Sequence, residues 1–260
     1  MIFIDPDLKQ ILSLFPPRAL LVVNKADVVR SGFLLLKQMK DRASYMGDVE
    51  KLKSTLELPA VDVTTRPRSP DAGEVLPRKL SRVEGELILQ VYFRQIVACD
   101  TLHLDLRARH FSKLQDGRLL WEPSALRTSW DSSFRQGVLS LYEGFYYSRP
   151  EVFEQGLERL GLFGSHQDVA TRRKVASVFS EHFGEGRSRP IRFEVAHLRS
   201  SFESIFEMLL SYGIPIDSRF AMLGAALCTL YTTLEKIEEP LDVRRSYLAA
   251  IGGSKSTCGE

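Results

Sequence analysis

The sequence predicts a mainly α protein of the α+β class, in which a helical bundle carries one small β-hairpin. Apolar residues recur every three or four positions over most of the chain, which is the period of an amphipathic helix. Around Asp116-Gly117 apolar and polar residues alternate instead, and an Asp-Gly pair is typical of a tight hairpin turn. A stretch rich in proline between Pro59 and Pro77 separates two helical parts.

The N-terminal part, residues 1–58, is expected to be a helical segment. Its apolar residues Leu20, Val23 and Val28 recur at near-helical spacing, with charged residues between them. Residues 59–83 are expected to be a linker, because prolines remove backbone donors and break regular helices.

The main body is expected within residues 84–252. Its first helix begins near Glu84 and ends at Asp100-Thr101, the hairpin follows, and the chain beyond Pro123 is helical again. Residues 253–260 are small and polar and are expected to be a flexible tail. The later helices carry these apolar stripes: Phe134, Val138, Leu141 and Phe145; Val152, Phe153, Leu157 and Leu160; Val175, Val178 and Phe179; Leu198, Phe202, Ile205, Phe206 and Leu209; Phe220, Leu223, Leu227, Leu230, Leu234 and Ile237.

The composition is that of an ordinary globular protein. The chain has 260 residues, 44% of them hydrophobic, and a core of that size needs neither disulfides nor metals to hold it. The 35 Lys and Arg residues balance 33 Asp and Glu residues, for a net charge of +2. Such a balance leaves no basic footprint, so nucleic acid is not expected as a partner.

Cysteine usage and the N-terminus indicate an intracellular, reducing compartment. Cys99, Cys228 and Cys258 are an odd number without a Cys-x-x-Cys pair, which argues against a disulfide framework and a structural zinc site. The longest apolar run near the start, Ala19–Val23, is too short for a membrane span, and no targeting signal is visible. Peripheral contact with a membrane or lipid remains open, because it needs only an amphipathic surface.

One segment has the spacing of a kinase catalytic loop. His103 and Asp105, followed by His110, match the pattern H-x-D-x-x-x-x-N, in which Asp accepts the substrate hydroxyl proton and Asn holds magnesium. His110 stands where the magnesium ligand Asn would be, and imidazole is a poor ligand for a hard cation. Pro123 falls where the metal-binding Asp of D-F-G would be, and only a one-residue shift brings Glu122 there.

The sequence around this loop resembles the C-lobe of the UbiB (aarF-domain) atypical kinase family, which is associated with ubiquinone biosynthesis. In that family the loop reads roughly H-A-D-P-H-P-G-N. The resemblance implies that residues 84–252 form a degenerate kinase-like C-lobe. It runs through VYFRQIVACDTLHLD, DGRLLW and GVLSLYEGFYYSRPEVFEQGLERLGLF, and continues in YGIPIDSRFAMLGAALCTLYTTLEKIEEPLDV.

The family's N-lobe signatures are missing from this sequence. Neither the lysine-glycine-glutamine helix, the alanine-rich nucleotide loop nor the phosphate-binding strand lysine is found before residue 90, and residues 1–80 are too few for that lobe. Of the family's catalytic positions only His103 and Asp105 carry over, as vestigial residues. The resemblance therefore implies a pseudokinase that acts as a noncatalytic binding or regulatory protein in quinone or lipid metabolism, with no cofactor expected.

Two other functions stay open. In the first, the chain is a divergent UbiB-like ATPase or kinase completed by a partner, with Asp105 as the base, His110 and Glu122 as metal ligands, and ATP and magnesium as cofactors. In the second, it is a helical protein-interaction module without a ligand. Arg107 and Arg109, within the same loop, could also attract a phosphate or an anionic headgroup.

Overall fold

The computed structural model describes residues 41–65, 80–163 and 167–252, together with positions 33, 37 and 40 and the strand at 74–75. Most of these residues are helical and the strands are short, which confirms the mainly α class. Within the expected N-terminal segment, α4 (Arg42–Leu56) is a helix. Residues 1–32 and the expected tail 253–260 lie outside the described part. No described helix is both long enough and apolar enough to cross a bilayer.

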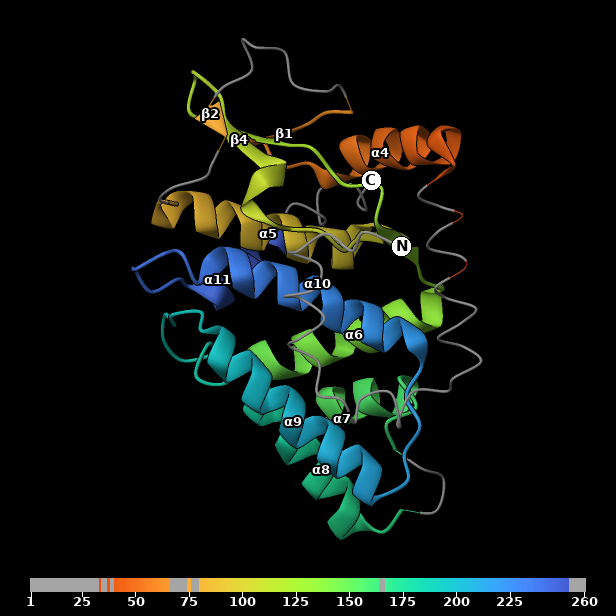
Figure 1. Cartoon of the computed structure of the whole chain (residues 1–260). Coiled ribbons are helices and arrows are strands. Elements are labelled where there is room, and N and C mark those ends of the chain that lie inside the picture. The colour runs from red at the N-terminus through yellow and green to blue at the C-terminus, as the bar shows by residue number, and fades with distance from the viewer. Residues whose placement is uncertain are drawn as a thin grey trace, which may run out of the picture.

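The hairpin around Asp116-Gly117 is confirmed, and it belongs to a four-stranded sheet with the order β1-β5-β4-β2. Gly117 has a φ of 86°, which a residue without Cβ adopts at no steric cost. This sheet and α4 lie at one end of the molecule and α8 and α9 at the other (Figure 1). The strands are β1 (Val61–Val63), β2 (Glu74–Val75), β4 (Phe111–Lys113) and β5 (Leu119–Trp121).

The range 59–83, expected to be a linker, differs from that expectation because it supplies both edge strands. β1 pairs in parallel with β5, and the side chains of Val61 and Val63 are buried. Their burial on the sheet outweighs the surrounding prolines, since β-branched residues pack well on a pleated surface. A second, two-stranded sheet pairs β3 (Thr101–His103) with β6 (Arg127–Ser129).

A local sequence signal marks the start of the first helix of the main body. Ser81 and Glu84 form a capping box at the start of α5 (Arg82–Ala98). The expected apolar stripes are mostly buried in one core, and Cys99 and Cys228 are buried there as free thiols. The remaining helices are α6 (Ser132–Tyr146), α7 (Pro150–Arg159), α8 (Val169–His182), α9 (Val195–Ser211), α10 (Ser218–Leu234) and α11 (Val243–Gly252).

Two close approaches hold the helices together. A Cβ added to Gly144 in α6 would lie 2.3 Å from the backbone nitrogen of Phe153 in α7, so the glycine permits this contact. The buried guanidinium of Arg94 in α5 donates at 2.9 Å to the carbonyl oxygens of both Leu56 and Ala250. Arg94 thereby satisfies carbonyl groups near the C-terminal ends of α4 and α11, which have few partners within their own helices.

Candidate functional site

The candidate site is the site loop, residues 103–110, between β3 and the β4–β5 hairpin. It ends in the 3₁₀ turn η1 (Ala108–His110). At its start the side chain of Gln95 in α5 accepts the His103 N–H at 2.9 Å, and His103 pairs with Arg127 across the small sheet. The loop therefore lies on a fixed platform made by one helix and two strands.

His103 is a fully buried histidine in this loop. Its Nδ1 lies 3.0 Å from the carbonyl oxygen of Ser124, and because a carbonyl only accepts, Nδ1 carries the proton. Burial lowers the pKa of His103 to about 4, against the opposing effect of the Ser124 hydrogen bond, so the imidazole is neutral near pH 7. The site loop is thus tied through His103 to the segment that follows β5.

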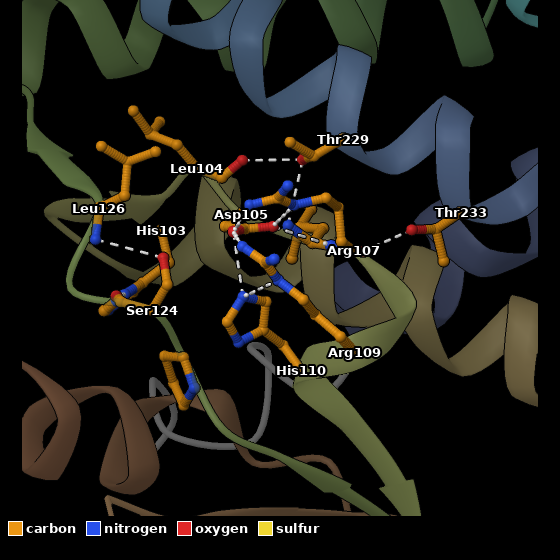
Figure 2. Close-up of polar contacts among 12 residues, drawn as sticks. His103, Leu104, Asp105, Arg107, Arg109, His110, Ser124, Leu126, Thr229 and Thr233 are labelled. Atoms are coloured by element: carbon orange, nitrogen blue, oxygen red, sulfur yellow. Dashed lines mark hydrogen bonds and ion pairs between the residues drawn. The ribbon is translucent and has the colours of Figure 1, made fainter. Parts of the chain in front are cut away.

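Asp105 points towards two arginines and a histidine of its own loop (Figure 2). Arg107 donates to both carboxylate oxygens, at 2.7 Å from Nε and 2.6 Å from an Nη atom. Nε2 of His110 lies 3.0 Å and a guanidinium nitrogen of Arg109 lies 3.4 Å from Oδ2. Burial by itself raises the pKa of Asp105, but the hydrogen bonds and charges of Arg107 and His110 together hold it well below its usual range.

This arrangement disfavours the proton-accepting role that the sequence pattern suggests for Asp105. A carboxylate with a strongly lowered pKa is a weak general base, because proton transfer is most efficient when the pKa lies near the working pH. Both oxygens already accept hydrogen bonds from Arg107, and the carboxylate side chain is only 4% exposed. The guanidinium of Arg107 thus binds an internal carboxylate within its own loop.

Two threonines of α10 fix the backbone of the site loop from the opposite side. Oγ1 of Thr229 lies 2.7 Å from the carbonyl oxygen of Leu104 and accepts the Leu106 N–H at 3.1 Å. Thr233, one helical turn later, donates its hydroxyl to the Leu106 carbonyl at 2.9 Å. All of these groups are buried, so each hydrogen bond satisfies a polar atom that water does not reach.

A backbone hydrogen bond joins the two candidate metal positions, His110 and Glu122. The Glu122 N–H donates to the His110 carbonyl at 2.8 Å, and the Tyr45 hydroxyl of α4 donates to the Pro123 carbonyl at 2.6 Å. The His110 imidazole, however, faces Asp105. In the described ranges, no group of three or more His, Cys, Asp or Glu side chains has the geometry of a metal site.

An ion pair between a buried arginine and a partly exposed aspartate connects the site platform to α4. Arg127 is 1% exposed; its Nε lies 2.5 Å from an oxygen of Asp48, and it donates to the Ser44 hydroxyl at 3.0 Å. Sequence reasoning missed Arg127, Thr229 and Thr233. The two threonines did carry a signal, because polar residues four positions apart interrupt the apolar stripe of α10.

Comparisons with known proteins give no family for this chain. No protein-family model matches it, and no curated protein matches it significantly. The UbiB assignment stays a prediction from the sequence resemblance.

Proposed function

We propose that this protein is a degenerate UbiB-like pseudokinase, which acts as a noncatalytic binding or regulatory protein in quinone or lipid metabolism. The observation that carries the proposal is the internal occupancy of Asp105. Its carboxylate is paired with Arg107, Arg109 and His110, so it has neither the basicity nor the open oxygen that phosphotransfer requires.

The order of elements supports the same proposal. A helix, a short strand, the site loop, a hairpin and a second strand paired with the first follow one another from α5 to β6. The site loop carries His103 and Asp105 at the spacing of a catalytic loop, on a backbone held by Thr229 and Thr233. A loop whose backbone is held by a distant helix and whose carboxylate is paired internally is what loss of catalysis with retention of fold would leave.

A second candidate function is a divergent ATPase completed by a partner chain. The hydrogen bond from Glu122 to His110 favours it, because it brings the two candidate metal positions together. This candidate requires a proton-accepting Asp105 and magnesium-dependent nucleotide binding, with the contacts to Arg107 released in the complex.

Calorimetry with ATP and ADP, with and without magnesium, separates the two candidates. The pseudokinase proposal expects no saturable, magnesium-dependent binding up to millimolar nucleotide for the purified chain, for Asp105→Asn or for Glu122→Gln. Asp116→Asn makes the same chemical change at the exposed hairpin turn and serves as the matched control. Magnesium-dependent binding that weakens tenfold, about 1.4 kcal/mol, in Asp105→Asn or Glu122→Gln but not in the control would refute the proposal.

A further inference from the structure

An open cleft of about 490 Å³ lies where the chain passes from α8 to α9, beside the loop that precedes α11 (Figure 1). None of its lining residues belongs to the site loop. Its volume is in the range of clefts that hold a small ligand. Its lining combines the apolar side chains of Pro190, Ile191 and Pro240 with charged ones.

The chain just before α9 forms one wall of this cleft and has a fixed backbone. Ile191 and Leu241 exchange two backbone hydrogen bonds, at 3.0 and 2.8 Å, and the Phe193 side chain is buried. The backbone is still extended at Glu194. Because successive side chains of an extended chain point to opposite sides, Arg192 and Glu194 both point away from the core, and both line the cleft.

Arg192 and Glu194 are the charges of this cleft that the described part of the chain leaves unpaired. Arg189 forms an ion pair with Glu185, so those two charges neutralise each other. Glu235 of α10 accepts the N–H of the first residue of α9 at 2.8 Å, and the Glu194 side chain makes no cap. The exposed guanidinium of Arg192 and carboxylate of Glu194 have neither a hydrogen bond nor an ion pair with a described residue.

This pair of charges favours a zwitterion whose own charges are separated. The Cα atoms of residues two positions apart in an extended chain are about 6.6 Å apart. An α-amino acid carries both of its charges on one carbon, and a phosphomonoester carries about 1.5 to 2 negative charges near pH 7, more than Arg192 alone balances. An ethanolamine phosphodiester carries one negative and one positive charge, joined by a two-carbon chain. It therefore matches Arg192 and Glu194 in both charge and separation.

We propose that this cleft binds an ethanolamine phosphodiester, with the phosphate on Arg192 and the ammonium on Glu194. The planar guanidinium can donate to two phosphate oxygens at once, and the carboxylate accepts the N–H groups of the ammonium. The apolar side chains of Pro190 and Pro240 line the space beside the charges, where the carbon skeleton would lie. This goes beyond the proposed function, because no residue of the site loop takes part.

The test is a calorimetric titration of the full chain near pH 7 with glycerophosphoethanolamine, a soluble ethanolamine phosphodiester. The wild-type chain is expected to bind it saturably. Glycerol phosphate and ethanolamine, which each carry one of the two charged groups, are expected to bind about tenfold more weakly or less. Arg192→Gln and Glu194→Gln are each expected to weaken binding of the diester about tenfold.

Arg199→Gln and Glu203→Gln are the matched controls, because they make the same chemical changes at exposed positions of α9 outside the cleft. Both are expected to bind like the wild type, and thermal unfolding of each variant checks the fold. No saturable binding by the wild-type chain would overturn the proposal. So would equal affinity for glycerol phosphate, or unchanged affinity in a folded Arg192→Gln or Glu194→Gln protein.

Flotation with phosphatidylcholine vesicles, with and without phosphatidylethanolamine, identifies the source of the ligand. Flotation that requires both phosphatidylethanolamine and Arg192 would support a lipid headgroup as the ligand. Binding of the soluble diester without flotation would support a free phosphodiester. Nucleotide binding does not enter these outcomes, so the proposed function can fail separately.

Discussion

The hydroxyl oxygen of Thr229 in α10 lies 2.7 Å from the carbonyl oxygen of Leu104 in the site loop. The two residues are 125 positions apart, and the same hydroxyl also accepts the Leu106 N–H. The backbone on both sides of Asp105 is therefore held by a helix from the C-terminal third of the chain.

We expect Thr229→Val to lower the free energy of unfolding by about 1 to 3 kcal/mol. The substitution removes the buried oxygen that accepts the Leu106 N–H and the one proton that the Leu104 and Ala226 carbonyls share. Urea denaturation measures the change. Thr232→Val is the matched control, since the Thr232 hydroxyl donates only to the Cys228 carbonyl of its own helix. Equal losses in the two variants would mean that Thr229 does not hold the loop.

Arg107→Gln is expected to destabilise the protein by about 3 kcal/mol near pH 7, because it leaves the buried Asp105 carboxylate without its main partner. The lowered pKa of Asp105 means that its stabilising contribution is complete above about pH 4 and is lost as the pH falls further. In Arg107→Gln the pKa of Asp105 rises, so the free energy of unfolding falls less as the solution is made acidic.

Carbon-13 NMR of the Asp105 carboxylate, with unfolding measured from pH 7 to pH 3, checks both effects. Arg109→Gln is the control, because Arg109 is farther from the carboxylate and 44% exposed. A carboxylate that titrates at the same pH in wild-type and Arg107→Gln proteins would contradict the internal pairing.

The buried His103 is expected to make the fold less stable in mild acid. Its pKa is lowered from 6.5 to about 4 in the folded state, so the unfolded chain binds a proton that the folded chain does not. At about 1.4 kcal/mol per unit, the free energy of unfolding falls by about 3 kcal/mol between pH 6.5 and pH 4.

His103→Asn keeps a donor for the Ser124 carbonyl and has no titrating ring, so its stability should depend less steeply on pH in this range. Chemical denaturation at several pH values provides the comparison. The same pH slope in wild type and variant would show that His103 titrates normally.

Gly144→Ala is expected to destabilise the α6–α7 pair by about 1 to 3 kcal/mol, because the new methyl group would overlap the backbone of Phe153. The control is Gly47→Ala in α4, where a Cβ meets no atom within 4 Å. There the substitution should raise stability by about 0.5 to 1 kcal/mol through helix propensity. Thermal unfolding of both variants tests the contrast, and two changes of the same sign would contradict it.

Local sequence signals predict much of the fold. The apolar stripe from Leu198 to Leu209 indicates a helix because it runs through several turns, and Asp116-Gly117 indicates the hairpin because it requires a specific turn. β1 carries no comparable signal, since three residues are too few to show a period. Its partner β5 lies 58 positions later in the chain, which no local pattern reveals.

The candidate site is likewise predicted only in part by local sequence patterns. The spacing of His103 and Asp105 singles out the loop, and the structure brings Asp105 and His110 within 3.0 Å of each other. The sequence does not reveal that Arg107, only two positions away, folds back onto Asp105. Its Nε and one of its Nη atoms donate to the carboxylate. That contact depends on the path of the loop backbone, which distant Thr229 and Thr233 determine.

The contact between Arg94 and Ala250 has a consequence for biosynthesis. The two residues are 156 positions apart, and at about 5 to 20 residues per second a ribosome needs about 8 to 31 s to pass from one to the other. Throughout that interval the Arg94 guanidinium, which the folded core buries, lacks one of its two carbonyl acceptors, the Ala250 oxygen. Native closure around α5 therefore waits until α11 has been synthesised, and a nascent chain stalled before that point is a natural client for chaperones and proteases.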